Sequence, residues 1–271
     1  MHVSTGCVPN AVLSVARQIR SSGGRVMLVG GAVIDIVLGR VPKDWDLEVY
    51  GVSYDDLAAT LSNHNPKLVG QAFGIIKINF DGFDIDINVP RKDNKVGIGH
   101  KGFEVLMDPS MTVEEAARRR DFTINALAMD VFTGEIADPF GGLNDLHAGI
   151  LRATDPRLFV QDPLRPLRAM QLLARKAKSV DHDTMQLIRS MVDTFPEIAP
   201  ERVHEEWRKL LLKAERPSVG LEFLRNSGWI VHFPELHALI GCEQHPEWHP
   251  EGDVWIHSCG TVDSAAWGRD Q

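Results

Sequence analysis

Two aspartates follow a glycine pair near the start of the chain, and this order constrains both the fold and the chemistry of the segment. The apolar run at 26–29 predicts a buried strand over 25–29, and Gly30 and Gly31 lead from it into a predicted helix. A glycine turn at the start of a helix leaves backbone N–H groups that can bind phosphate. Asp44 and Asp46 are spaced at i and i+2, so their side chains lie on one face of a strand.

The spacing of the two carboxylates predicts a metal site. Both side chains can reach the same cation, and oxygen ligands suit Mg²⁺. A phosphate-binding turn combined with metal-binding carboxylates favours phosphoryl or nucleotidyl transfer from a nucleoside triphosphate. Asp44 and Asp46 are therefore the predicted metal ligands and catalytic residues. A solvated aspartate pair at the start of a strand is the alternative, because that is the usual fate of a D-x-D sequence.

The composition limits the class of protein. The chain has 271 residues, of which 44% are apolar, so it can bury a core and form one to three domains. No apolar run is long enough to span a membrane, no secretory signal is visible, and the three cysteines have no disulfide-like spacing. These features favour the cytoplasm. The net charge of −8 argues against a surface coated in basic residues, but it is compatible with a local basic stripe for nucleic acid.

Strand and helix signals divide the chain into two parts at about residue 143. In the first part, strands and helices alternate, and two strands surround the turn Asp81-Gly82. The stretch 91–103 is rich in Lys, Gly and Asp and predicts a loop. The expected fold class is α+β, a mixed sheet with helices followed by an all-helical part. The predicted helices cover 8–20, 32–38, 54–63, 113–128, 162–178, 182–195, 200–214 and 217–227.

Five groups of residues, in this order, resemble the five motifs of class II tRNA nucleotidyltransferases (CCA-adding enzymes) and bacterial poly(A) polymerases. One such motif alone would be weak, whereas five in the expected order are highly specific. Together they cover most of residues 25–215. They lie at 30–40 with 44–46, 119–126, 138–152, 161–169 and 201–210.

The resemblance implies a fold and an activity. It implies a polymerase-β-like nucleotidyltransferase head (1–142), a helical neck for base selection (143–215) and the start of a helical body (216–271). It also implies the addition of CMP and AMP, from CTP and ATP, to the 3′ end of tRNA without a nucleic-acid template. A-adding, CC-adding and poly(A)-adding enzymes share these motifs, so the motifs do not distinguish among these activities. An impaired RNA- or nucleotide-binding module is the alternative from another class.

Asp86 is expected to be a third catalytic carboxylate. Residues 83–87 alternate between apolar and acidic side chains, which places Asp84 and Asp86 on one face of a strand. Asp86 is preferred because it lies four residues before Pro90, as the family's pattern suggests. A plain solvent-facing pair of aspartates is the alternative.

The resemblance also implies a set of nucleotide-binding residues in the first part of the chain. Asp121 and Asn125 are spaced at i and i+4, so they share a face of a helix, and they are expected to hold the ribose and phosphates. An N-cap role for Asp121 is the structural alternative. The other residues expected at the nucleotide are Gly30, Gly31, Arg40 and Arg120.

Asp162 and Arg165 are expected to select the base. They are spaced at i and i+3 and so are adjacent on one helical face. Cytosine and adenine each present an amino donor beside a ring-nitrogen acceptor, which matches an aspartate acceptor beside an arginine donor. Guanine and uracil present a carbonyl there and would face the carboxylate badly. Arg168, one turn further on, is expected to stack on the base or position it, and an ordinary salt bridge between Asp162 and Arg165 is the alternative.

Three residues depart from the family's pattern. Ile34 replaces an arginine, which removes a possible phosphate contact. Gln161 replaces a glutamate and cannot form an ion pair that would orient Arg165. Pro166 is expected at the fourth position of a helix that follows Asp162, where it would distort the first turn.

The C-terminal segment at 245–257 resembles the start of an HD phosphohydrolase domain. Such a domain needs a later His-Asp pair for its metal, and no histidine follows His257. The HD-like segment is therefore expected to be incomplete, and the chain to be a fragment or a short relative. A zinc site is a further alternative, although the spacing matches no regular finger. Its candidate ligands are Cys242, His245, His249, His257 and Cys259.

Overall fold

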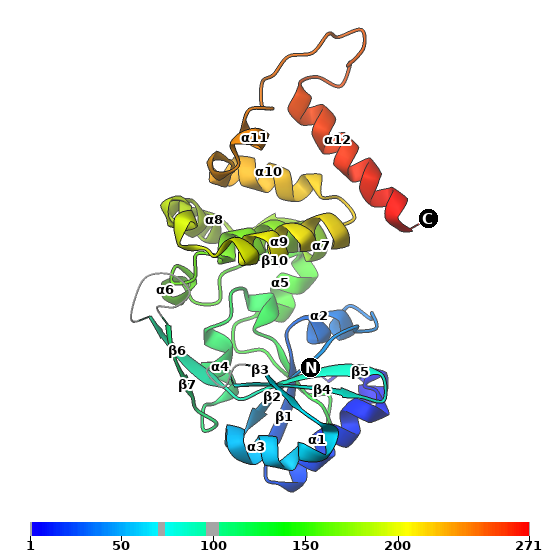
Figure 1. Ribbon diagram of the computed structural model, residues 1–271, viewed down its shortest axis with the longest axis vertical. Coiled ribbons are helices and arrows are strands. Elements are labelled where there is room, and N and C mark those ends of the chain that lie inside the picture. The colour runs from blue at the N-terminus through cyan, green and yellow to red at the C-terminus, as the bar shows by residue number, and fades with distance from the viewer. Residues whose placement is uncertain (1, 70–73, 96–102, 271) are drawn as a thin grey trace. The chain divides into compact units, whose positions relative to one another are not determined.

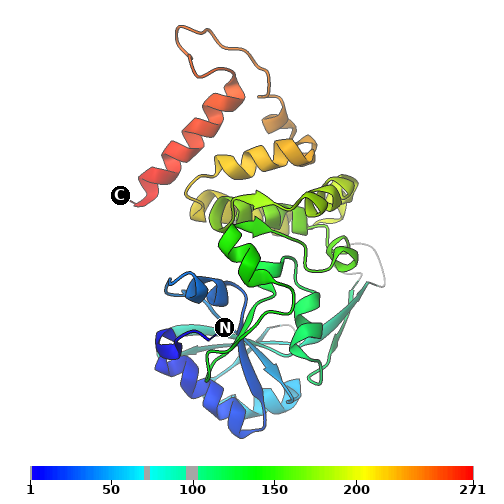
Figure 2. The same ribbon diagram turned by 180° about the vertical axis from the view of Figure 1, so that it is seen from behind.

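The computed structural model describes residues 2–69, 74–95 and 103–270 (Figure 1). These residues belong to two compact units, the first ending at Leu146 and the second beginning at His147. Figure 2 shows the same elements from behind. The finer division of the chain into head, neck and body stays a prediction.

One mixed sheet organises the first unit. Its strands are β1 (Arg25–Val29), β2 (Trp45–Tyr50), β3 (Lys67–Val69), β4 (Ile75–Phe80), β5 (Phe83–Asn88), β8 (Ala128–Asp130) and β9 (Ile136–Ala137). In the described part of the unit, these seven strands lie in the order β3-β4-β5-β2-β1-β8-β9. β2 runs parallel to β5, whereas β1 is antiparallel to both β2 and β8. A mixed sheet combined with helices confirms the predicted α+β class.

Helices cover both faces of this sheet. α1 (Asn10–Ser21) and α3 (Tyr54–Thr60) lie on one face, below the sheet in both views, and α2 (Gly31–Val37) lies on the other. The apolar stripe predicted for α1 is buried, as is typical of a helix that packs on a core. Gly24 allows a close approach here, because a Cβ on it would lie 2.8 Å from Ile19 Cγ2 and 3.2 Å from Val49 Cγ1.

Alternation along β2 separates two sets of side chains. Trp45, Leu47 and Val49 are buried on the side of α1. Asp46, Glu48 and Tyr50 therefore point to the other face. There Tyr50 packs in a core cluster with residues from β1, β8 and α4 (Val113–Arg118), so this face is apolar at one end of β2 and acidic at the other.

The loop predicted at 91–103 is wrong at both of its ends. Residues 91–95 form β6 (Arg91–Lys95), which pairs in antiparallel fashion with β7 (Phe103–Met107). The middle of the predicted loop lies outside the described residues. Polar composition suggested a loop, but the backbone hydrogen bonds of a strand pair do not require apolar side chains.

The single helix predicted at 113–128 is also wrong. α4 begins with a capping box between Thr112 and Glu115 and ends at Arg118. The chain then turns through a short 3-10 helix (Thr123–Asn125) and enters β8. Phe122 has an extended backbone, which interrupts the helix. Hydrophobic spacing alone did not reveal this break, because buried residues continue on both sides of it.

The second unit is mainly helical, as predicted. Its helices, including α5 at the boundary, are α5 (Gly142–Ala148), α6 (Pro156–Phe159), α7 (Arg165–Lys176), α8 (His182–Ser190), α9 (Pro200–Lys213), α10 (Ser218–Ser227), α11 (Pro234–His237) and α12 (Val254–Trp267). Four of these match the predicted helices to within a few residues. α7 packs against both α9 and α10. Two short parallel strands, β10 (Ile150–Leu151) and β11 (Ser179–Val180), were not predicted.

Short 3-10 segments complete the described structure, at Thr5–Cys7, Ser62–His64, Val192–Glu197, Trp229–His232 and Gly268–Asp270. Across the part of the chain that the structure describes, no helix has the length and apolar character needed to cross a bilayer.

Candidate active site

The predicted catalytic carboxylates lie at neighbouring positions of β2 and β5. Asp46 and Asp86 are direct partners in the parallel pairing of these strands, and Asp44 immediately precedes β2. Exposure decreases along this face, from exposed Asp44 through half-buried Asp46 to Glu48, which is only 3% exposed. The strand pairing thus places Asp86 beside Asp46, while the catalytic role of all three aspartates stays a prediction.

The charges around Asp46 change its protonation. Burial and the nearby carboxylates of Asp86 and Asp44 raise the pKa of Asp46 to about 6, against the opposing effect of Arg120 and Lys77. A divalent cation would relieve the repulsion between these carboxylates. Carboxylate oxygens are also the ligands that hard cations prefer. The donors Asp44, Asp46 and Asp86 therefore fit a hard divalent metal ion.

A cleft of about 740 Å³ opens beside these carboxylates. Its lining includes Asp44, Asp46 and Asp86 together with Lys67 and Lys77. Carboxylates suit a metal ion, and lysine ammonium groups suit phosphate oxygens. The cleft therefore offers both kinds of group that a metal–triphosphate complex needs.

Lys77 is a residue of this cleft that the sequence interpretation missed. Its Nζ donates to Asp86 Oδ2 at 2.5 Å, and the two residues are direct partners in the β4–β5 hairpin. A signal for this contact was present. The two-residue turn Asp81-Gly82 fixes the hairpin register, and counting outward from it pairs Lys77 with Asp86.

The glycine turn after β1 faces the acidic end of β2. Gly30 has a φ of 69°, in the region that favours glycine. A Cβ on Gly30 would lie 3.8 Å from Asp46 Oδ2 and 4.0 Å from Arg120 Nη1. Gly31 begins α2, and a Cβ there would meet nothing within 4 Å. The backbone of this turn is thus open beside a carboxylate and a guanidinium.

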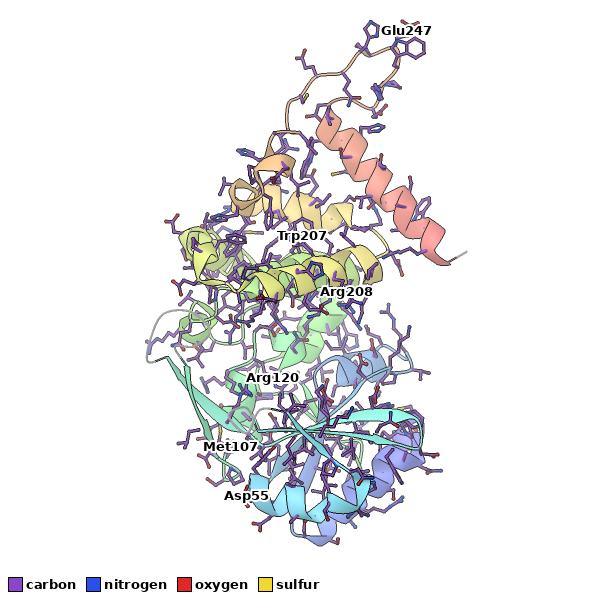
Figure 3. All side chains as sticks on the ribbon, viewed as in Figure 1. Asp55, Met107, Arg120, Trp207, Arg208 and Glu247 are labelled. Carbon is purple, nitrogen blue, oxygen red and sulfur yellow. The ribbon has the colours of Figure 1, made fainter. Side chains whose placement is uncertain are left out.

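A buried acid, which the sequence interpretation did not single out, holds Arg120. Arg120 Nη2 donates to Glu48 Oε1 at 3.2 Å, and Tyr50 Oη donates to Glu48 Oε2 at 2.6 Å. Burial favours the protonated acid, but the Arg120 charge and the Tyr50 hydrogen bond outweigh it and hold the pKa of Glu48 below its usual range. Figure 3 shows Arg120 on the side of the sheet that carries α2. Glu48 continues the period of two that links Asp44 and Asp46, and this spacing predicts its face.

Asp121 and Asn125 contact each other, although not on a helix as predicted. Asn125 Nδ2 donates to Asp121 Oδ1 at 2.8 Å, and the same oxygen accepts the N–H of Phe122 at 2.8 Å. Asp121 is buried and lies between α4 and the 3-10 helix at Thr123–Asn125. The side chain of Asp121 caps no helix in the described structure. The turn between α4 and the 3-10 helix brings the two side chains together, instead of the i, i+4 spacing of a helix as predicted.

Arg40 and Ile34 differ in how exposed their side chains are. Arg40 follows α2 and is exposed. Ile34, which stands where the family's pattern has an arginine, is 1% exposed and belongs to the core of the first unit. In this chain, position 34 therefore contributes to packing.

In the second unit, Asp162 is held by a residue of α9. Its Oδ2 accepts from Arg202 Nη2 at 3.3 Å, and its Oδ1 accepts from the backbone N–H of Leu164 at 3.1 Å. α7 begins only at Arg165, so Asp162 and Arg165 do not share a helical face as predicted. The N–H of Arg165 instead bonds to the carbonyl of Asp162 at 3.2 Å, which makes a turn before the helix.

The later start of α7 also corrects the prediction for Pro166. Pro166 is the second residue of the helix, and N–H groups of the first turn have no partner within a helix. It therefore removes no intrahelical hydrogen bond, and the predicted distortion is wrong. Arg165 and Arg168 lie in this first turn, with the Arg165 guanidinium carbon 5.6 Å from the centre of the Phe159 ring.

The HD-like segment brings together only part of the candidate zinc set. Glu251 Oε1 bonds to His257 Nδ1 at 2.6 Å and to His249 Nδ1 at 3.2 Å, and these bonds lower the pKa of Glu251 to about 2. Among the described residues, the potential ligand atoms of these three lie within 4.8 Å of one another. Cys242 and Cys259 are outside this group. The five-residue set is therefore not assembled.

Comparison with known proteins places this site in a family. Residues 26–152 match the model of the poly A polymerase head domain, and residues 179–240 match a probable RNA- and SrmB-binding site of polymerase A. Proteins described as multifunctional CCA proteins from Xanthomonas campestris pv. campestris and Vibrio parahaemolyticus are 40% and 39% identical over 248 and 253 residues. This chain belongs to the class II CCA-adding enzyme and poly(A) polymerase family. It covers 58% and 59% of the length of these two relatives, which in turn match 89% of it.

Solved structures of the family share the fold. The Bacillus stearothermophilus CCA-adding enzyme in complex with CTP matches 81% of this chain and 52% of its own, with a TM-score of 0.71 and 28% identity. A tRNA nucleotidyltransferase complexed with a primer tRNA and an incoming ATP analogue matches 86% of this chain and 64% of its own, with a TM-score of 0.65 and 27% identity. Nucleotidyltransferases of this family generally use divalent metal ions.

Proposed function

We propose that this protein adds CMP and AMP to the 3′ end of tRNA without a template, by nucleotidyl transfer from CTP and ATP. The pairing of Asp46 with Asp86, beside a glycine turn and Arg120, is the observation that carries this proposal. Family membership supports the choice of substrates, because relatives of the same fold bind CTP, an ATP analogue and primer tRNA. tRNA and nucleoside triphosphates are cytoplasmic, and we place the reaction there.

The reaction joins the tRNA 3′-oxygen to the α-phosphorus of the nucleotide. The bond between the α- and β-phosphates breaks, pyrophosphate leaves, and the proton of the 3′-hydroxyl is released. Asp44 and Asp46 would hold Mg²⁺, with Asp86 as the third carboxylate beside them. Bound metal ions would activate the attacking oxygen and stabilise the leaving pyrophosphate. The carboxylates are suited to this role because the protein has already brought their negative charges together.

The phosphates and ribose would contact the glycine turn and the segment that follows α4. Backbone N–H groups of Gly30 and Gly31 are open to phosphate oxygens, and Arg120 Nη1 lies at the same turn. Arg40 would add a further positive charge from the end of α2. Asp121 and Asn125, held together by a hydrogen bond, would contact the ribose.

Asp162, Arg165 and Arg168 of the second unit would select the base. Asp162 is an acceptor for the amino group of cytosine or adenine, and Arg165 is a donor for the adjacent ring nitrogen. The contact with Arg202 orients the Asp162 carboxylate. An acceptor at this position faces the carbonyl that guanine and uracil present unfavourably, which would restrict addition to C and A.

The test is incorporation of each of the four labelled nucleoside triphosphates, with Mg²⁺, into three RNAs. These are tRNA that ends before CCA, tRNA that ends after CC, and an unrelated RNA. We expect C on the first, A on the second and nothing on the third. A alone after CC would make the protein an A-adding enzyme, C alone a CC-adding enzyme, and long A tails on any RNA a poly(A) polymerase. Nucleotide binding without incorporation would reject the enzymatic proposal in favour of a binding module.

A further inference from the structure

Glu48 is a buried carboxylate at the end of the acidic face of β2. It is 3% exposed, and each of its oxygens has a partner: Tyr50 Oη at 2.6 Å and Arg120 Nη2 at 3.2 Å. A buried carboxylate is costly unless it is paired and hydrogen-bonded. The chain maintains this costly group directly behind the predicted metal ligands, on the same face of the same strand.

The partner of Glu48 reaches the glycine turn. Arg120 uses Nη2 for Glu48, and its Nη1 lies 4.0 Å from the position that a Cβ on Gly30 would take. A guanidinium presents its donors in a rigid plane, so fixing one edge also fixes the direction of the other. Glu48 therefore determines where the second edge of Arg120 points.

Asp46 is a competing partner for Arg120. Its Oδ2 lies 3.8 Å from the same point at Gly30, and the Arg120 charge already acts on Asp46. Without Glu48, the guanidinium would be drawn to the Asp46 carboxylate. That pairing would neutralise a predicted metal ligand and remove Arg120 from the turn.

We propose that Glu48, supported by Tyr50, is a positioning residue that holds Arg120 at the glycine turn for the triphosphate and away from Asp46. Tyr50 is anchored in the core cluster of the first unit, so its hydroxyl fixes the carboxylate of Glu48 in turn. This inference rests on the proposed function, because it assigns Arg120 to the nucleotide.

The two tyrosines of the chain provide a matched pair of variants. Both are buried in the first unit, Tyr50 at 6% and Tyr54 at 7% exposure. Tyr50 Oη donates to Glu48, whereas Tyr54 Oη has no hydrogen-bond partner in the described structure. Replacing either by phenylalanine removes one buried hydroxyl, and only one of the two changes affects the proposed support of Arg120.

The experiment measures CTP affinity by calorimetry and kcat and KM for CTP in the full chain, with a denaturation curve for each variant. We expect Glu48→Gln and Tyr50→Phe to weaken CTP binding and to raise its KM, by about tenfold for Glu48→Gln, because the ion pair between Glu48 and Arg120 becomes a hydrogen bond to an uncharged amide. Tyr54→Phe should leave both unchanged. In an Arg120→Ala background, Glu48→Gln should have no further effect on CTP affinity, a result that general loss of stability would not produce.

Unchanged CTP affinity in folded Glu48→Gln would overturn the inference, as would equal effects of Glu48→Gln with and without Arg120. If Glu48→Gln does not fold, the comparison of Tyr50→Phe with Tyr54→Phe decides, and equal CTP affinities would contradict the inference. Failure of the proposed function is separate. If the wild-type protein binds CTP but adds no nucleotide, the proposed function is rejected, while the effect of Glu48 on CTP affinity can still be tested. If the wild-type protein binds no CTP, both the proposed function and the role of Glu48 are rejected.

Discussion

On the acidic face of β2, the carboxylate of Asp46 is close to those of Asp44 and Asp86, an arrangement that favours the binding of a cation. Asp46 is partly buried between Asp44 and Asp86, and its pKa of about 6 records the cost of keeping it ionised without a cation. An apolar or amide side chain at this position would pack without that cost, so the proposed metal-binding role of Asp46 would lower the stability of the metal-free protein.

Asp46→Asn should stabilise the metal-free protein, and the gain should grow with pH. The folded pKa is raised from 3.8 to about 6, so the stability contributed by Asp46 is fully present below pH 3.8 and is lost as pH rises through 6. Thermal unfolding in EDTA should show a higher Tm for the variant by a few degrees at pH 8. The difference should be smaller at pH 5. Adding Mg²⁺ at pH 8 should stabilise the wild type more than the variant, and an equal Tm difference at both pH values would contradict the assignment.

Asp86→Asn and Asp84→Asn test which aspartate of β5 acts with Asp46. Asp86 is the strand partner of Asp46, whereas Asp84 is exposed and bonds to Asn79 at 2.7 Å. We expect the first variant to lower the rate of CMP incorporation by about 100-fold or more, since it removes a carboxylate at the metal site. The second should stay within about threefold of the wild type. Equal losses in the two variants would argue against a specific role for Asp86.

For helices and strands, the sequence predicts the regular segments well and the connections between them poorly. The strand, glycine turn and helix around Gly30 were predicted, as were the β4–β5 hairpin and the helices that became α7 to α10. These depend on periodicity and glycine placement, which are local properties. The wrong predictions have non-local causes, since β6 pairs with β7, which lies beyond residue 102, and the chain leaves the helical conformation after α4 so that Phe122 can be buried in the core.

Residues of the candidate site were likewise predicted where the signal is local and missed where it is not. Asp46 and Asp86 were predicted from the alternation of side chains along a strand and from the family's motifs. Lys77 was not predicted, although the register of the hairpin pairs it with Asp86. Glu48 carried the correct spacing, but nothing local shows that Arg120 lies beside it, because the two are 72 residues apart. The pairing of Asp162 with Arg202 was likewise missed, since it joins the turn before α7 to a separate helix, α9.

Arg202→Gln tests the link between these two elements. Arg202 pairs with Asp162, and we expect its loss to leave the acceptor less well oriented and to reduce the preference for CTP and ATP over GTP and UTP by about tenfold. The control is Arg208→Gln on the same helix, α9. Arg208 is exposed, pairs with Glu205 at 3.5 Å and is labelled in Figure 3. A change of nucleotide preference in both variants, or in neither, would contradict the proposed role of Arg202.

In the whole molecule, the residues proposed for the chemistry and those proposed for base selection belong to different units. The first contains the carboxylates, the glycine turn and Arg120, and the second contains Asp162 and Arg165. A net charge of −8 also means that a polyanion such as tRNA must be bound through local groups of basic residues.

This division predicts two kinds of defect. Asp46→Ala should abolish the addition of every nucleotide, because the chemistry is common to all of them. Asp162→Ala should preserve addition but reduce the selection of C and A, because the acceptor that repels a base carbonyl is removed. Competition between the four triphosphates in one tube, with sequencing of the products, measures both effects. Loss of all incorporation in Asp162→Ala with an intact fold would contradict a role confined to selection.

Metal-dependent CCA addition is tested most directly by comparing wild-type protein with Asp46→Ala on tRNA that lacks its CCA end. The reaction contains CTP, ATP and Mg²⁺, circular dichroism verifies that the variant is folded, and the tRNA 3′ ends are sequenced. We expect C, C and A on the tRNA with the wild-type protein, no addition with Asp46→Ala, and no addition by the wild type in EDTA. Addition by Asp46→Ala at the wild-type rate, or no addition by the wild type, would contradict the proposed function.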